Sequence, residues 1–293
     1  MFAKAYSIVR NFTFPIIISH RTYDGKCASG IGTFIVINDE GWFITAFHIM
    51  QQIQQLAEAN KTYKALVTER KKIEDDKTLL QQMIKAKLKN LKIEPTHITN
   101  FSIFPGLLGT RIIGTTHVIP AADIAIGKLD GFDKTLVKEY PRFKDPARPM
   151  EQGTSLCKIG FPFHVIQPTF ENERFNLPPG ALPVPLFPIE GIYTRQIEVK
   201  SDVPMKFPIK FVETSSPGLR GQSGGPTFDV QGTIWAIQSQ TRHFPLGFGS
   251  NQKHSKNAEH LKHQYLNVGW GTHSETIVNL LKEKNINFHL SDY

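Results

Sequence analysis

Hydrophobic and polar positions along the first fifty residues follow a β-like pattern. Apolar runs at 14–19, 32–37 and 41–45 are short, and the tetrapeptide Asn-Asp-Glu-Gly at 38–41 is a turn signal between the last two. Short apolar runs bounded by turn residues are typical of strands rather than helices. We therefore predict three strands here, of which the last two form a hairpin.

A helical period replaces this pattern between Trp42 and Glu94, where the chain contains neither Gly nor Pro. A stripe of mainly apolar residues with a spacing of three and four forms one helical face. Its members are Ile49, Ile53, Leu56, Asn60, Tyr63 and Val67, and then Leu80, Ile84, Leu88 and Leu91. One continuous helix here would run ~65 Å, and the β pattern resumes after Pro95 with no chain left to return. We therefore predict an inserted αα-hairpin over about 49–93, turning near 74–77.

The remainder of the chain is again strand-like and ends in a helix. Further predicted strands are 97–104, 111–118, 123–129, 153–163, 191–199, 209–214, 232–240 and 265–270. Nine prolines lie between 162 and 208, so we predict a long ordered loop over about 164–190. Ser274 is the predicted N-cap of a helix that ends near 284. Many short strands and a terminal helix predict a mainly β, barrel-type fold.

Composition excludes several classes of protein. Hydrophobic residues make up 40% of the 293 residues, which is enough for a core and excludes wholesale disorder. No run approaches the ~18 apolar residues of a membrane span. The apolar run at 14–18 is short, contains Pro15 and lacks a cleavage site behind it, so we interpret it as a strand rather than a signal peptide.

Charge and cysteine content narrow the picture only a little. The net charge is +8, and residues 50–92 hold ten Lys and Arg against five Asp and Glu, so +5 of the excess is local to the predicted hairpin. Such a balance permits an acidic partner without requiring one. Two isolated thiols, Cys27 and Cys157, suit a reducing cytoplasm, and a single bridge between them remains an alternative.

Three segments have the residue types that nucleophilic catalysis needs. Thr-Ala-Phe-His ends at His48, Asp123 opens an alternating apolar run, and Ser223 stands in Gly-Gln-Ser-Gly-Gly-Pro. A serine hydroxyl is a poor nucleophile until an imidazole takes its proton, and a carboxylate can hold that imidazole in one tautomer. We therefore predict His48, Asp123 and Ser223 as the catalytic residues.

The glycines around Ser223 complete this hypothesis. The attacked carbonyl oxygen becomes negative and needs preorganised donors, and Gly221 allows a turn that presents the N–H groups of Gly221 and Ser223 to it. We predict these two amides as the oxyanion hole. We expect the two glycines that follow Ser223 to leave room for the substrate.

Together these motifs resemble the trypsin/chymotrypsin family of serine proteases. The segments match that family's TAxH, DxAxxxL and GxSGGP patterns, in the family's order of His, Asp and Ser, over roughly residues 13–48 and 97–284. The resemblance implies two packed six-stranded β-barrels, with His48 and Asp123 from the first and Ser223 from the second. We expect an N-terminal half over 1–145 and a C-terminal half over 146–293.

Within that family the chain is closest in style to the HtrA-like bacterial branch. Residues 223–239 align with its pattern of a short hairpin and strand without a gap, which implies that Gln238, Ser239 and Gln240 lie on the strand that pairs with substrate. We expect no PDZ domain, since about 50 residues follow that strand. Gln222 stands where secreted members carry an Asp that pairs with a new N-terminus, so we do not expect activation by cleavage.

Substrate preference is only partly encoded in recognisable positions. The acyl residue of a substrate is the residue whose carbonyl is attacked. The resemblance implies that Pro217 forms the base of the pocket that receives the side chain of the acyl residue. Cleavage after Lys or Arg normally uses an Asp there and is not expected. Arg220 near the cleft mouth, with the histidine-rich loop, suggests the hypothesis of a preference for acidic substrate residues.

Two further features receive plain interpretations. His243, His254, His260 and His263 match no strong zinc pattern, so we predict a solvated loop, no metal and no cofactor. The basic hairpin has one aromatic residue, Tyr63, and mixed charges, so we expect it to pack on the barrel or to dock a regulatory protein, and we do not expect nucleic acid there.

The sequence thus predicts a cytoplasmic, trypsin-like serine endopeptidase acting on protein or peptide, with no membrane association. Lacking a zymogen signature, it would be controlled through the hairpin or the 164–190 loop. Two alternatives remain: a protease-fold scaffold without turnover, and an effector of a bacterial defence module whose hairpin binds a partner or nucleic acid.

Overall fold

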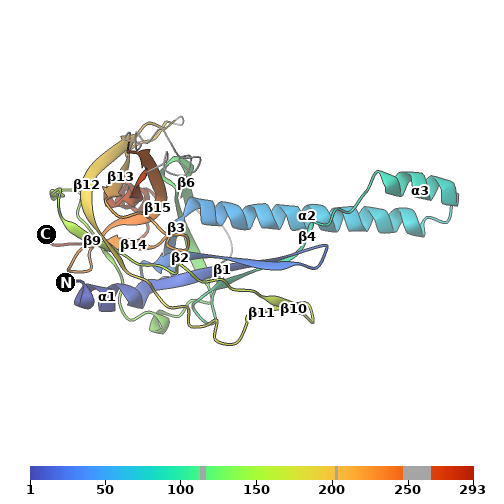
Figure 1. The fold of residues 1–293 in the computed structure, drawn as a ribbon, viewed down its shortest axis with the longest axis horizontal. Coiled ribbons are helices and arrows are strands. Elements are labelled where there is room, and N and C mark those ends of the chain that lie inside the picture. The colour runs from blue at the N-terminus through green and yellow to red at the C-terminus, as the bar shows by residue number, and fades with distance from the viewer. Residues whose placement is uncertain (113–116, 202–203, 247–264) are drawn as a thin grey trace, which may run out of the picture.

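The computed structural model describes residues 1–293 except 113–116, 202–203 and 247–264. The structure is mainly β, with two sheets joined by one large apolar core and a helical arm that projects from the body (Figure 1). Side chains from both sheets, such as Phe34 and Phe43 from the first and Phe211 and Phe228 from the second, are buried in this core.

The first sheet follows the order β4-β1-β2-β3-β7-β5, with β6 also paired to β7, and all its ladders are antiparallel. Its strands are β1 Thr13–Thr22, β2 Cys27–Val36, β3 Trp42–Ala46, β4 Ile98–Pro105, β5 Arg111–Ile112, β6 His117–Ile119 and β7 Ile124–Asp130. The two ends of the path, β4 and β5, contact each other, so the sheet curls into a barrel. The middle of the predicted strand 111–118 lies outside the described residues.

The second sheet closes on itself. The pairings β14-β9-β12-β13-β16-β15 return to β14 and make a ring of six strands, while the short β8 and β17 extend it beyond β15. Its strands are β8 Arg142–Phe143, β9 Ser155–Lys158, β12 Ile189–Val199, β13 Ile209–Thr214, β14 Pro226–Phe228, β15 Ile234–Pro245, β16 Tyr265–His273 and β17 His289–Leu290. This topology confirms the predicted double barrel, although the first sheet has seven strands rather than six, since β5 and β6 pair with different parts of β7.

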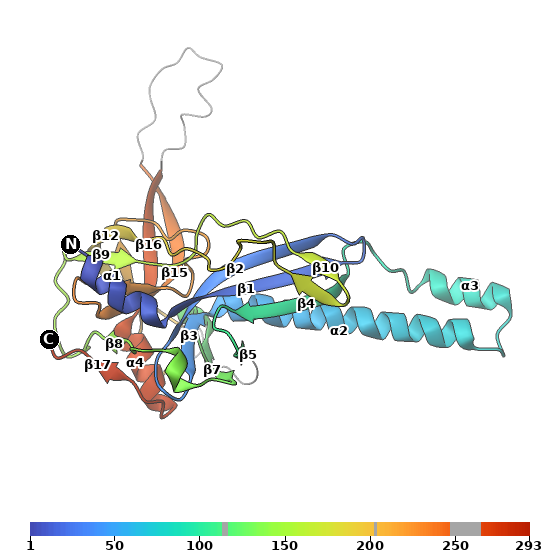
Figure 2. The same cartoon turned by 90° about the horizontal axis from the view of Figure 1, so that it is seen from below.

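The predicted helical insertion is present, but its two arms are unequal. α2 spans Phe47–Asp75 and α3 spans Gln81–Lys89, so the turn lies where the charged run at 74–77 predicts it. At 1.5 Å per residue α2 is ~43 Å long and α3 only ~13 Å. The extended strand β4 therefore covers the rest of the return path along α2 (Figure 2). A short second helix is sufficient because an extended residue spans about twice the length of a helical one.

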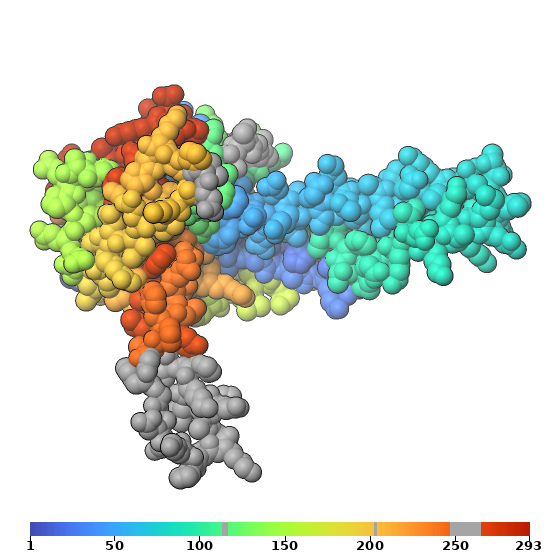
Figure 3. Space-filling view, turned by 90° about the horizontal axis from the view of Figure 1, so that it is seen from above, coloured from blue at the N-terminus to red at the C-terminus, as the bar shows by residue number. Residues whose placement is uncertain are grey.

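Contacts along α2 explain the polar member of its stripe. Asn60 is buried and its amide donates to the carbonyls of Ile98 and Thr99 on β4, and Tyr63 packs against Tyr23 from the β1–β2 hairpin. The first half of α2 therefore rests on β4 and the β1–β2 hairpin, and the rest of the helical arm protrudes from the body (Figure 3).

Both ends of the described chain cross over between the barrels. α1, Ala3–Val9, precedes the 3₁₀ turn Arg10–Phe12, and the ring of Phe2 packs edge-on against Phe228 of the second barrel. After α4, Ser274–Glu283, the chain returns to the first barrel, where the Asn38 amide donates to the Asn287 carbonyl at 2.9 Å.

Several local predictions need correction. The N-cap of α4 is His273, whose Nδ1 accepts from Glu275 N–H at 3.0 Å, and not Ser274. Burial lowers the pKa of His273 to about 4, which keeps the ring neutral and able to accept. The predicted strand 153–163 is shorter, because Gly160 and the prolines after it end β9 at Lys158. The hairpin of β10, Thr169–Glu171, and β11, Arg174–Asn176, lies in the loop region and was not predicted.

The two thiols do not form a bridge. Cys27 is free and partly exposed on β2, and Cys157 is free and buried on β9. Burial raises the pKa of the Cys157 thiol to about 12, so this group is an inert core residue. Among the helices of the described chain, none combines the length and hydrophobicity that crossing a bilayer requires.

Candidate active site

His48 and Asp123 meet at the point where β3 passes into α2. His48 is the second residue of α2, and its Nδ1 lies 2.9 Å from Oδ2 and 3.1 Å from Oδ1 of Asp123. An ionised carboxylate can only accept, so the proton of the neutral imidazole resides on Nδ1. This leaves the Nε2 lone pair free to accept a proton from another group.

Asp123 has a second task that the sequence did not reveal. It lies in the left-handed region at φ 49° between the 3₁₀ turn Pro120–Ala122 and β7, and its Oδ1 accepts from the His48 backbone N–H at 2.9 Å. Ala46, the N-cap of α2, has no side chain that could do this. Asp123 therefore caps α2 from across the sheet, and the positive end of the helix favours its negative charge.

A residue of the second barrel holds the same carboxylate. Ser239 Oγ donates to Asp123 Oδ2 at 2.6 Å. Gln238 pairs with Gly271 and Gln240 pairs with Trp270, so Ser239 is the extra residue of a β-bulge in β15. Because a bulge re-aims a side chain, the side chain of Ser239 contacts Asp123 while its backbone stays on the strand predicted to pair with substrate.

The glycines after Ser223 are required by packing and not by substrate. A Cβ on Gly224, at φ 83°, would lie 2.1 Å from the Thr33 carbonyl oxygen, and a Cβ on Gly225 would lie 2.2 Å from that of Ile159. Thr33 N–H also donates to the Ser223 carbonyl at 2.9 Å. The loop that carries Ser223 is thus pressed onto β2 of the first barrel, and the expectation that these glycines make room for substrate is wrong.

Gly221 occupies the turn before Ser223. Gln222 N–H donates to the Leu219 carbonyl at 2.9 Å, Gly221 has φ 95° and Arg220 has a negative φ, which together define a type II turn. The Gly221 carbonyl accepts from Thr33 Oγ1 at 2.7 Å and from Phe161 N–H at 3.1 Å. The carbonyl is therefore held by two donors, and the peptide cannot rotate without losing both.

The amides of this loop differ from their surroundings. Within the part of the chain that the structure describes, no acceptor is hydrogen-bonded to the N–H of Gly221 or of Ser223. Buried backbone N–H groups are almost always paired, and Gly221 is buried. Two unpaired amides beside a serine can stabilise an oxyanion that forms there.

Gln222 is fully buried between them, and its amide is satisfied by neutral groups. Its Oε1 accepts from Leu219 N–H at 3.0 Å and its Nε2 donates to the Phe187 carbonyl at 3.2 Å. No charged partner contributes to this arrangement. Gln222 instead ties the turn before Ser223 to the proline-rich loop.

A cleft of about 1030 Å³ brings most of the predicted site residues together. The predicted residues in its lining are His48, Gly221, Ser223, Arg220, Gln238, Ser239 and Gln240. Pro217 does not line it, and the neighbouring Gly218 and Leu219 do. Among the described residues no hydrogen bond joins Ser223 Oγ to His48, which is common for catalytic pairs without substrate.

The cleft also contains residues that the motifs did not indicate. β2 contributes Ser29, Gly30 and Ile31, α2 contributes Ile49 and Gln52, the proline-rich loop contributes Phe163, His164 and Val165, and β15 contributes Thr241. Gln52 follows His48 by four residues, one helical turn, and this spacing is the one signal that could have found it. The others come together only through barrel closure.

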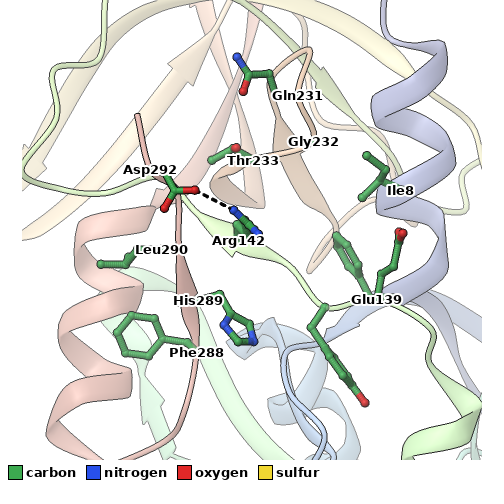
Figure 4. A pocket seen from close by; sticks show the side chains of 12 residues that line it. Ile8, Glu139, Arg142, Gln231, Gly232, Thr233, Phe288, His289, Leu290 and Asp292 are labelled. Carbon is green, nitrogen blue, oxygen red and sulfur yellow. Dashed lines mark hydrogen bonds and ion pairs between the residues drawn. The ribbon is translucent and has the colours of Figure 1, made fainter.

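A second hollow and the predicted histidine-rich loop are the other candidate sites. Figure 4 shows a second hollow of about 940 Å³ between α1 and the chain end, where Arg142 pairs with Asp292 at 3.0 Å, and it contains none of the predicted site residues. His243 Nδ1 lies 2.6 Å from Asn267 Oδ1, while His254, His260 and His263 lie outside the described residues. Within the described residues no group of three His, Cys, Asp or Glu could hold a metal ion.

Comparison with known proteins gives structural likenesses alone. No protein-family model matches the chain, and no curated protein matches its sequence. A variant of the HtrA-type protease AlgW with a tripeptide is similar at a TM-score of 0.47 and 13% identity, over 97% of this chain and 63% of that one. This chain therefore corresponds to less than two thirds of the AlgW chain.

Two structures of Rv3671c from M. tuberculosis are also similar in fold. The inactive form of a serine-to-alanine variant has a TM-score of 0.45 at 11% identity, over 95% of this chain and 89% of that one. The active form has a TM-score of 0.46 at 12% identity, over 98% and 86%.

Proposed function

We propose that this protein is a serine endopeptidase in which Ser223 attacks the peptide carbonyl. The observation that carries the proposal is the position of His48: Asp123 holds its Nδ1 at 2.9 Å, while its ring lines the same cleft as Ser223. Nε2 takes the Ser223 proton during attack and then returns it to the leaving amine. Asp123 orients the imidazole and stabilises the imidazolium that forms.

The unpaired amides support the second part of the mechanism. The N–H groups of Gly221 and Ser223 would receive the carbonyl oxygen as it becomes negative, and the two bonds to the Gly221 carbonyl fix the Gly221–Gln222 peptide that lies between these donors. Gln238 is already bound on the edge of β15 that faces β14: its N–H donates to the Gly225 carbonyl at 2.7 Å and its carbonyl accepts from Gly224 N–H at 2.8 Å. Beyond Gln238 this edge has no partner among the described strands, and substrate backbone would pair with it from Ser239 onward.

Hydrolysis of a fluorogenic peptide library tests this function. The wild-type protein should cleave members of the library, and Ser223→Ala and His48→Ala should each reduce the rate by about 10⁴-fold or more. Cleavage that survives in Ser223→Ala would assign the activity to a contaminant or to another site. Because folding must be intact, each variant needs a far-ultraviolet and near-ultraviolet circular dichroism spectrum that matches the wild type.

A scaffold without turnover is the second candidate, favoured by the missing hydrogen bond between Ser223 and His48. A fluorophosphonate probe separates the two, because it reacts with an activated serine and not with an ordinary one. Labelling of Ser223 supports the protease. A folded protein that binds peptides in this cleft and is never labelled supports the scaffold.

Control by a partner protein at the arm is part of the proposal. The arm projects from the body (Figure 3), and the basic residues Lys85, Lys87 and Lys89 of α3 lie at its far end, in keeping with the partner expected there. Reversing these three charges should leave hydrolysis of a short peptide unchanged while weakening binding of an acidic regulator. A loss of peptide hydrolysis would contradict a role limited to docking. The free thiols fit the predicted reducing cytoplasm.

A further inference from the structure

A buried ammonium group lies behind the wall of the cleft. Lys158, the last residue of β9, is 1% exposed. Its Nζ donates to Thr214 Oγ1 at 2.9 Å, to the Ser216 carbonyl at 2.6 Å and to the Pro217 carbonyl at 3.0 Å. A Cβ on Gly269 would lie 2.6 Å from this Nζ, so the backbone opposite is kept bare to admit it.

This ammonium has no counter-charge. Among the described residues no carboxylate oxygen lies within 4.0 Å of Lys158 Nζ, and Glu213, the residue before Thr214, is committed to Arg195, Thr194 and Trp270. Burial of an unpaired ammonium is unfavourable, and it lowers the pKa of Lys158 to about 7. A core position that needed only volume would be better filled by an apolar side chain.

Only one layer of backbone separates Lys158 from the cleft. Its two carbonyl acceptors belong to Ser216 and Pro217, and the next residue, Gly218, lines the cleft. The Gly218 carbonyl accepts from Thr241 Oγ1 at 2.6 Å, and Gln238 packs against Gly218 so closely that a Cβ there would lie 2.2 Å from its Nε2. The wall between the ammonium and the cleft is therefore rigid and thin.

The described lining of the cleft contains no acidic residue, although the Asp123 carboxylate lies behind two of its members, His48 and Ser239. Its 18 residues include no Asp and no Glu, and its charged or titratable members are Arg220, His48 and His164. Arg220 is exposed and precedes Gly221 in the type II turn. A cavity lined by one sign of charge attracts ligands of the other sign.

We infer that the cleft selects an acidic acyl residue, and that Lys158 is a specificity-determining residue that acts through the pocket wall while Arg220 acts at its mouth. The inference rests on the proposed function. The segment 217–220 runs directly into the oxyanion donors, so a residue whose carbonyl meets Gly221 and Ser223 directs its side chain toward this segment. A Glu or Asp side chain there supplies the anion that the buried ammonium lacks.

Matched peptide pairs test the inference. The acyl residue is Glu or Gln in one pair and Asp or Asn in the other, so that size and hydrogen-bonding capacity stay nearly constant while charge changes. We expect kcat/KM to be at least about tenfold higher for the acidic member. We expect Lys158→Met to lower that ratio about tenfold, the order for a unit charge acting across ~12 Å at an effective dielectric constant of ~20. Arg220→Gln should lower it by a smaller factor.

Lys144→Met is the matched control. Lys144 is also buried and its Nζ donates to a main-chain oxygen of Tyr293, the last residue of the sequence, but it does not line the cleft. The Lys144→Met substitution removes the same charge from the same barrel but outside the cleft lining. The ratio of kcat/KM for the Glu and Gln peptides should therefore not change. Raising the salt concentration should reduce the Arg220 effect more than the Lys158 effect, since a buried charge is screened less.

The outcomes separate the two proposals. A wild-type enzyme that cleaves peptides without preferring the acidic member of each pair contradicts the inference and leaves the proposed function intact. Equal loss of the ratio in Lys158→Met and Lys144→Met also contradicts it, because the effect would then come from net charge. If Lys158→Met does not fold, the inference is judged from the acidic-to-amide ratios of kcat/KM in the wild type and in Arg220→Gln. Absence of any cleavage by folded protein contradicts the proposed function itself.

Discussion

The two halves of the candidate active site are built in opposite ways. On the first barrel the Asp123 carboxylate is already fully bound, since it accepts from the backbone and ring of His48 and from Ser239. On the second barrel, in the described chain, the amides of Gly221 and Ser223 have no acceptor, although their neighbours are packed against β2 without spare room. The difference indicates that one half is completed by the protein and the other is reserved for a ligand.

The largest effect is expected from breaking the completed half. Asp123→Asn replaces an oxygen that accepts with an amide that donates, so it favours the wrong tautomer of His48. We expect kcat for peptide hydrolysis to fall about 10⁴-fold. Asp130→Asn, at the exposed end of the same strand, should change little. Near-normal activity in folded Asp123→Asn would contradict the orienting role.

The reserved half is tested at Gly221. Gly221→Ala adds a Cβ that would lie 2.4 Å from the Phe161 carbonyl oxygen at a backbone φ of 95°. We expect kcat to fall about 10²–10³-fold, the range for loss of an oxyanion donor, with a smaller change in KM. Gly153→Ala is the control, since Gly153 has φ 88° with nothing within 4 Å of the added Cβ. If both variants lose activity equally, general backbone strain explains the loss and the oxyanion role fails.

The link between the reserved half and the proline-rich loop depends on Gln222. Gln222→Met keeps the volume but leaves Leu219 N–H and the Phe187 carbonyl without partners. We expect the free energy of unfolding to fall by roughly 2–4 kcal/mol in urea titrations, together with slower hydrolysis. Gln196→Met, on the exposed face of β12, should be nearly neutral. An unchanged stability would show that water replaces both bonds.

The smallest expected effect is a pH dependence from Lys158. Because burial lowers the pKa of Lys158 to about 7 in the folded state, well below its ordinary value of 10.5, the unfolded state binds more protons above pH 7. The free energy of unfolding should therefore rise with pH above 7. Cys157, with its pKa raised to about 12 from 9.0, acts in the opposite direction near pH 9 and above.

Urea titrations between pH 7 and 8.5 avoid that opposing effect. The wild-type free energy of unfolding should increase across this window, and that of Lys158→Met should increase less. Lys144→Met should keep the wild-type slope. Parallel slopes for the wild type and Lys158→Met would contradict the lowered pKa.

The sequence predicted those parts of the site that lie in local patterns. His48, Asp123 and Ser223 each stand in a short motif on the expected element. The strand runs predicted a barrel-type fold, and the family resemblance implied two barrels. Three contacts could not be predicted in this way. Ser239 reaches Asp123 across 116 residues of sequence and only through a bulge, Asp123 caps a helix that begins 76 residues before it, and Lys158 is recognisable only when its three acceptors are in place.

The glycine motif shows the same limit. Gly221, Gly224 and Gly225 are easy to find, but their reasons differ. Gly221 and Gly224 each combine a positive φ with a close approach to a carbonyl, of Phe161 and of Thr33, whereas Gly225 is required by its close approach to the Ile159 carbonyl alone. A pattern identifies where a side chain is excluded, and only the packing shows what excludes it.

The most direct test of the central claim is the site and rate of fluorophosphonate modification. Intact-mass and peptide-mapping measurements on the wild-type protein should find one adduct, on Ser223. Ser223→Ala should give none, and His48→Ala should form the adduct at least about 10³-fold more slowly, because the base is gone. An adduct on another residue, or equal rates in the wild type and His48→Ala, would contradict the account.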